Sequence, residues 1–190
     1  MLRSLERYAR PQTAGPRCDL CGAALAEKHE HVVEIAERQL ACACRACAVL
    51  FRDAGAGGGR FRTVPDRVAP VALEADLAAL GIPVRIAWVV RHGDEWIASF
   101  PSPAGPVDAA LDTAAWQSVS RSWRLEPDVE ALLIHRRRDA GLDCFIVPLD
   151  VCFELSGIIR KNWKGWGGGD EVWPKVESFF AALWARGGQT

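Results

Sequence analysis

The cysteines of this chain fall into a pattern that could bind a metal ion. Cys18 and Cys21 form one C-x-x-C pair. Cys44 and Cys47 form a second pair, with 22 residues between Cys21 and Cys44. Two thiolates at this spacing can approach one ion from a tight turn, and two such turns complete the tetrahedral four-sulfur shell that zinc favours. We therefore predict one zinc ion in a closed site, which indicates a structural role because no position remains for water.

Other residues of ligand type surround these pairs. Cys42 could replace Cys44 as a ligand, although packing within a hairpin is the simpler role for it. His29 and His31 are the other alternative ligands, because nucleases built on such fingers use a histidine there to activate water over a second metal. The helix after Cys47 lacks the histidine or asparagine partner that this chemistry needs. A metal-dependent, nuclease-like enzyme that uses His29 or His31, or the cleft between the two predicted modules, is therefore only an alternative.

A four-thiolate site could also hold iron, as rubredoxin does, and the protein would then carry electrons. Gly22, directly after the first pair, favours this alternative. The second pair instead continues into Ala48, Val49 and Leu50 without a glycine, which is typical of a helix and favours zinc. Iron is therefore the alternative metal.

The segment between the two pairs must bring them together. Residues 31–35 and 38–42 predict the two arms of a hairpin, and residues 44–52 predict a helix that carries the second pair. A cysteine turn, a hairpin and a helix in this order predict a treble-clef-like zinc finger over residues 17–53. Zinc binding would contribute about 10 kcal/mol or more to folding a module too small for a full core.

The rest of the chain predicts an α+β fold. Residues 1–16 predict a short helix and linker, residues 54–67 a Gly/Pro linker loop, and residues 68–190 a mixed α/β domain. Within that domain, the predicted helices cover residues 72–80 and 108–119, and the predicted strands cover 84–91, 95–100, 129–135 and 144–149. Two further helices, starting near Asp150 and Asp170, end the domain.

Composition limits the functions open to the protein. The 190 residues are 49% hydrophobic and carry a net charge of −1, which is typical of a globular protein and gives no strong signal for nucleic acid. No apolar run approaches the ~20 residues that span a bilayer, so we expect a cytoplasmic protein without membrane contact. Seven cysteines in a reducing compartment favour metal binding or packing over disulfides.

One cluster of aromatic and basic residues could bind a protein partner. Trp163, Lys164 and Trp166 precede a glycine-rich stretch and the start of the last predicted helix. Such side chains are common anchors at protein interfaces, although a solvated turn is the simpler interpretation. No catalytic set of residues can be assigned, so the sequence favours a non-enzymatic accessory protein that engages a protein partner.

Four segments give the chain a family resemblance. They are Arg-Cys-Asp-Leu-Cys-Gly, Cys-Arg-Ala-Cys-Ala-Val-Leu-Phe, Gly-Gly-Gly-Arg-Phe-Arg-Thr-Val-Pro-Asp-Arg-Val and Gly-Gly-Gly-Asp-Glu-Val-Trp. In these segments the chain resembles an uncharacterised bacterial family, mainly actinobacterial, whose genes often lie near nickel–iron hydrogenase genes. The resemblance implies a role in assembly, electron transfer or another accessory function of such a system, and it implies no catalytic residues.

Overall fold

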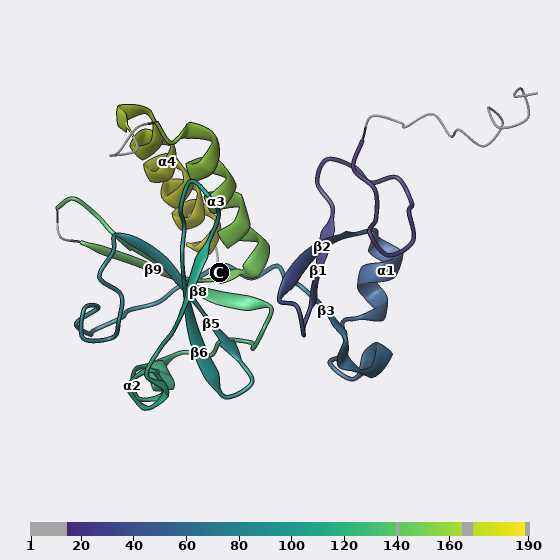
Figure 1. The fold of residues 1–190 in the computed structure, drawn as a ribbon, viewed down its shortest axis with the longest axis horizontal. Helices are drawn as coiled ribbons and strands as arrows, with labels where there is room; N and C mark the ends of the chain where they lie inside the picture. Colours follow the sequence, from purple (N-terminus) through teal and green to yellow (C-terminus); the bar gives the residue numbers. More distant parts are fainter. Residues whose placement is uncertain (1–14, 140, 165–168, 189–190) are drawn as a thin grey trace, which may run out of the picture.

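The computed structural model describes residues 15–139, 141–164 and 169–188, which form two separate antiparallel sheets with helices packed on them. Figure 1 shows the smaller, N-terminal sheet at one end of the molecule and the larger sheet at the other. This is the predicted α+β architecture, and it ends in two helices. The helix predicted within residues 1–16 lies almost wholly outside the described part. No described helix has the length and apolar character needed to cross a membrane.

The smaller sheet has the strand order β2-β1-β3, with β1 over Glu30–Glu34, β2 over Gln39–Ala43 and β3 over Phe61–Thr63. The short helix α1, Arg45–Leu50, packs on one of its faces. The fully buried residues of that contact are Val32, Ala43 and Ala48. We call residues 17–63 the finger. Its own apolar core is therefore very small.

The larger sheet has six strands in the order β4-β9-β8-β5-β6-β7, and every pair is antiparallel. The strands are β4 (Ala69–Pro70), β5 (Ile86–His92), β6 (Glu95–Phe100), β7 (Val107–Ala110), β8 (Glu130–Arg136) and β9 (Leu142–Pro148). The central strands β5, β8 and β9 are apolar over most of their length, as expected of strands covered on both faces. We call residues 69–187 the sheet domain.

Helices and loops bury the two faces of this sheet separately (Figure 1). The helices α3, Leu149–Asn162, and α4, Gly169–Gly187, cover one face. The helix α2, Thr113–Val119, and the loops around it cover the other. Alternate strand residues point to the α3/α4 face, and they are Ile86, Trp88, Ala131, Leu133, Phe145 and Val147. Their neighbours point to the α2 face, and they are Ala87, Val89, Leu132, Ile134, Cys144 and Ile146.

The finger packs against the sheet domain. Val33 of β1 and Val64, after β3, belong to the same buried cluster as the α3/α4 face of the larger sheet. Arg62 donates to the carbonyl oxygen of Pro127 at 2.8 Å and pairs with Glu126. The second face of the finger sheet is thus covered by the sheet domain.

The structure differs from three of the sequence-based predictions of local structure. Residues 72–76 are irregular and residues 77–80 form a turn instead of a helix, because the Asp76 carboxylate accepts from the Ala78 N–H at 2.9 Å and closes a single turn before Gly81. Residues 107–110 form the edge strand β7, and α2 starts only where Asp112 caps it, accepting from the Ala115 N–H at 2.7 Å. The segment 54–67, expected as a loop, contains the 3₁₀ helix η2, Ala56–Gly59, and the strand β3.

Candidate metal centre

The first cysteine pair lies on a tight turn at the start of the finger. The N–H of Gly22 donates to the carbonyl oxygen of Cys18 at 2.8 Å, and the N–H of Cys18 donates to that of Ala23 at 2.8 Å. Gly22 has a φ of 73°, a left-handed conformation that glycine adopts without strain. The glycine after the pair therefore lets the chain reverse direction beside the two sulfurs.

The second pair lies at the start of α1. Cys44 is the N-cap of this helix, and its Sγ accepts from the Cys47 N–H at 3.5 Å. Hydrogen bonds from free N–H groups at a helix start stabilise a thiolate. The helix predicted after the second pair is present, and it holds both sulfurs at the end of the finger that faces the first pair.

The two turns bring four sulfur atoms together. The Sγ atoms of Cys18, Cys21, Cys44 and Cys47 all lie within 4.8 Å of one another. The Sγ atoms of Cys21 and Cys44, which belong to different pairs, are 3.7 Å apart. Tetrahedral sulfurs around one ion at ~2.3 Å would lie about 3.8 Å apart. The group could hold a metal ion in a zinc-finger-like arrangement.

The four thiols shift one another's pKa in opposite directions. The backbone N–H of Cys47 is the main cause that lowers the pKa of Cys44. Burial raises the pKa of Cys18, but backbone hydrogen bonds, first from Cys44 and then from Cys21, outweigh it and lower the pKa to about 6. The hydrogen bond with the Cys21 side chain raises the pKa of Cys47 to about 12. A bound cation would favour the thiolate form of all four cysteines.

The remaining cysteines lie elsewhere. Burial raises the pKa of Cys144 to about 12 and that of Cys152 well above its ordinary value, as expected of thiols packed in a core. Cys42 is not part of the four-sulfur group. It lies with His29 and His31, and one ligand atom from each of these three residues lies within 4.8 Å of the others. The alternative ligands predicted from sequence thus form a group of their own.

The predicted partner-binding cluster is only partly described. Trp163 is half-buried and packs against the α3/α4 core. Lys164 is exposed, and its Nζ lies 2.8 Å from the Glu171 carboxylate. Trp166 lies outside the described residues. One member of the cluster therefore contributes to the core, which reduces the aromatic surface that it offers to a partner.

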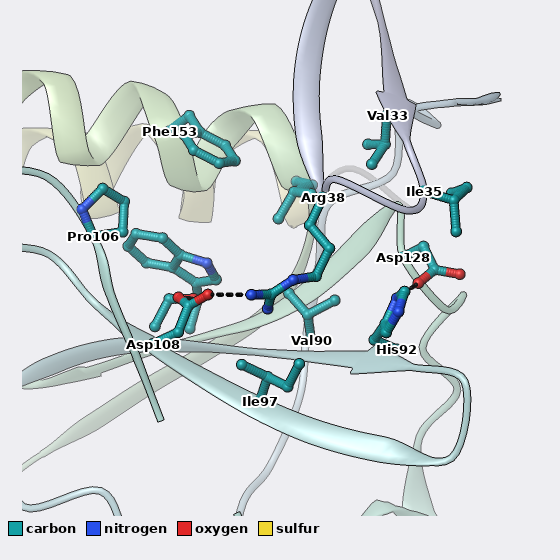
Figure 2. A pocket seen from close by; sticks show the side chains of 13 residues that line it. Val33, Ile35, Arg38, Val90, His92, Ile97, Pro106, Asp108, Asp128 and Phe153 are labelled. Carbon is teal, nitrogen blue, oxygen red and sulfur yellow. Dashed lines mark hydrogen bonds and ion pairs between the residues drawn. The ribbon is translucent and has the colours of Figure 1, made fainter. Parts of the chain in front are cut away.

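A cleft between the finger and the sheet domain has a volume of about 220 Å³ (Figure 2). Its apolar walls come from both parts and include Val33, Ile35, Val90, Ile97 and Phe153. An ion pair joins Arg38 of the finger to Asp108 of the sheet domain at 2.9 Å, and the Nδ1 atom of His92 lies 2.7 Å from the Asp128 carboxylate. These residues are far apart in sequence, so only the packing of the two sheets brings them together.

Two residues of the cleft have unusual backbone conformations. Arg38, in the turn of the finger hairpin, has a φ of 51°, and Asp128, before β8, has a φ of 67°. No other described non-glycine residue has a positive φ. Such conformations cost free energy and concentrate at functional sites. Their shared location in the cleft makes it a candidate binding site alongside the four-cysteine group.

The fold and the four-sulfur group define an α+β protein with a zinc-finger-like, potentially metal-binding module at its N-terminal side. The chain belongs to DUF5947, a family of unknown function whose model matches residues 17–187. The match covers the finger and the sheet domain together and begins one residue before Cys18. No curated protein and no solved structure matches the chain.

Proposed function

We propose that this chain is a non-enzymatic zinc-binding accessory protein that engages a protein partner. The observation that carries the proposal is the convergence of Cys18, Cys21, Cys44 and Cys47 to within 4.8 Å. Four protein thiolates fill the tetrahedral shell of zinc, so the ion would stabilise the fold and would not activate a water molecule. Zinc suits the site better than iron because the second pair opens a helix, whereas rubredoxin-like sites use two glycine-containing turns.

Metal content and colour test the first half of this proposal. We expect purified protein to be colourless, and Cys21→Ser and Cys47→Ser each to lower the zinc content by at least one ion per chain. Cobalt should replace that ion and give the strong sulfur-to-cobalt absorption of a tetrathiolate. Red protein with stoichiometric iron would instead support the electron-carrier alternative. Unchanged zinc content in both serine variants would contradict the assignment of these ligands.

The cleft is the proposed contact for the partner. Its apolar walls could accept a side chain or short segment of another protein, while Arg38 and Asp128 offer charges of both signs. The Trp163–Trp166 cluster is the rival contact. The link to nickel–iron hydrogenase assembly or function rests on the family resemblance alone, and it indicates where a partner should be sought first.

A binding assay with matched variants separates these two surfaces. Ile97→Lys places a charge in the cleft, and we expect it to reduce partner recovery from the native host without lowering the melting temperature by more than a few degrees. Leu50→Lys is the control, because Leu50 is 64% exposed on α1 and does not line the cleft. A Lys164→Ala/Trp166→Ala double variant tests the rival surface. Loss of the partner only in that double variant would refute the cleft as the contact.

A further inference from the structure

The finger hairpin places three potential ligands on one face of its sheet. His31 lies on β1 directly opposite Cys42 on β2. His29 precedes β1, and its ring lies beside that of His31 with the two ring centroids 4.8 Å apart. That face turns toward the sheet domain, because Val33 and Leu40 on it pack into the α3/α4 core. The opposite face carries Val32 toward α1, and the four-cysteine group is a separate cluster.

Hydrogen bonds engage Nδ1 of both imidazole rings and leave Nε2 as the nitrogen that could bind a metal. The Nδ1 atom of His31 lies 2.9 Å from a carboxylate oxygen of Asp150, in the first turn of α3. The Nδ1 atom of His29 lies 2.9 Å from the carbonyl oxygen of Ala26 and 3.1 Å from that of Glu27. Carbonyl and carboxylate oxygens only accept, so Nδ1 carries the proton in each ring. Each Nε2 atom of the neutral rings is therefore left with a lone pair.

Two buried polar atoms at this location have no hydrogen-bond partner among the described residues. They are Nε2 of His29 and Oδ1 of Asp150. Buried polar atoms without partners are uncommon and call for an explanation such as an ion. A metal ion on His29 would satisfy the first atom directly. The arrangement of Asp150 behind His31 also matches the carboxylate–histidine–metal relay that orients many metal ligands.

We propose that His29, His31 and Cys42 form a second metal site, distinct from the four-cysteine group, for zinc or a chemically similar divalent transition ion. Two imidazoles and one thiolate are ligands that zinc accepts, and Cys42 releases its thiol proton to solvent when the ion binds. Asp150 is a positioning residue that holds His31. Because the protein supplies three ligands, a fourth position stays open for water or an exchangeable donor. This site goes beyond the proposed function, which requires only the closed four-cysteine site.

The number of metal ions bound by wild-type protein is the first test. We expect two zinc ions per chain after equilibration with excess zinc and removal of weakly bound metal with a mild chelator. Cobalt titrated into metal-free protein should give two spectra, one of a tetrathiolate and one with the weaker charge-transfer absorption of a single thiolate. One ion per chain, with only the tetrathiolate spectrum, overturns the proposal whatever the variants do.

Variants then assign the second ion. His29→Ala/His31→Ala and Cys42→Ser should each bind one ion and keep the tetrathiolate spectrum of cobalt. His92→Ala is the matched control, because His92 makes a similar contact with Asp128, 2.7 Å, but has no cysteine or second histidine grouped with it. It should bind two ions. If the variants still bind two ions, these residues do not hold the second ion. If the variants lose both ions and also lose the tetrathiolate spectrum, the second site is not separate from the four-cysteine site. Either result overturns the proposal.

Asp150→Asn tests the relay without removing a ligand. We expect it to weaken zinc binding at the second site by about 10- to 100-fold and to leave the four-cysteine site unchanged, as for other residues that support a metal-ligating histidine. Competition with a chromophoric chelator measures both affinities in one experiment. An unchanged affinity at the second site would remove Asp150 from the proposal, and equal weakening of both sites would contradict their independence.

Discussion

The finger and the sheet domain obtain their stability from different sources. Only Val32, Ala43 and Ala48 are buried in the contact between α1 and the finger sheet. The sheet domain buries large side chains on both faces of six strands, among them Trp88, Trp116 and Phe145. Apolar burial contributes roughly 25 cal/mol per Å², so the finger lacks the area that the sheet domain has. We infer that metal ligation stabilises the finger in place of a large apolar core. Packing of apolar side chains is enough to stabilise the sheet domain.

The largest expected effect tests the finger directly. Cys21→Ser removes one of the four sulfurs, and metal binding contributes about 10 kcal/mol or more to modules of this kind. We expect amide protection in β1 and β2 to be lost, while β5, β8 and β9 remain protected. Hydrogen exchange with mass spectrometry measures both regions in one sample. Because Val33 and Val64 pack into the sheet-domain core, a uniform loss of protection would show that the two parts fold as one unit.

Within the sheet domain, truncation of an aromatic core residue should have the next largest effect. Phe145 is fully buried on β9, with Phe180 and Trp184 against its ring. Phe145→Ala should lower the free energy of unfolding by about 3–5 kcal/mol and leave the metal content unchanged. Val107→Ala, at a residue 57% exposed on the edge strand β7, is the control and should change stability by less than about 0.5 kcal/mol. Chemical denaturation measures both, and loss of metal in Phe145→Ala would weaken the contrast.

The third largest loss of stability is expected when a buried carboxylate near the junction of the finger and the sheet domain loses its cationic partner. Glu130 is 2% exposed, and Arg67 contacts both of its oxygens, with Nε at 2.8 Å and Nη2 at 2.6 Å. Arg67→Met should destabilise the protein by about 2–4 kcal/mol, because it leaves a buried charge unpaired. The Arg67→Met/Glu130→Gln double variant removes both charges and should recover part of the loss. No recovery would mean that the packing of Arg67, not its charge, is what matters.

The sheet domain should also lose stability in mild acid through His135. This side chain is buried against Phe180, and burial lowers its pKa below the ordinary value of 6.5, despite the nearby Asp143, which favours the charged form. The unfolded chain therefore binds a proton first as the pH falls below about 6.5, and stability falls from there until the folded-state pKa is reached. His135→Gln should show a smaller decrease in melting temperature between pH 7 and 5.5. An unchanged pH dependence would assign the effect to other groups.

The smallest effect is expected where the two parts meet at the surface. The side chains of Arg38 and Asp108 are 44% and 39% exposed, and exposed ion pairs contribute about 0–1 kcal/mol. Arg38→Gln should therefore lower the free energy of unfolding by less than about 1 kcal/mol, as measured by denaturation at low and at high salt. A larger loss of unfolding free energy at low salt that disappears at high salt would show that this ion pair stabilises the contact between the finger and the sheet domain.

Sequence patterns predicted the parts of this protein that depend on short-range spacing. The C-x-x-C pairs, the hairpin, the strands around residues 86–100 and the two last helices all follow from local turn chemistry or from apolar periodicity. The helix predictions for residues 72–80 and 108–110 are wrong, because a hydrogen bond to Asp76 and pairing with β6 outweigh a weak helical pattern. Helix propensities differ by only a few tenths of a kcal/mol per residue, which is less than the stabilisation that such contacts contribute.

What only the tertiary structure decided concerns residues that are distant in sequence. His29 and His31 were visible as ligand types, but their grouping with Cys42 depends on the strand register, and Asp150 reaches His31 across 119 residues. Asp150 does not cap α3, because the N-cap is Pro148 and Asp150 lies within the first turn. The cleft likewise forms where apolar residues of the two sheets pack against each other. No local sequence pattern predicts which surfaces of the two sheets will be in contact. Sequence alone therefore determined the four-cysteine motif, whereas packing of the finger on the sheet domain decided what surrounds it.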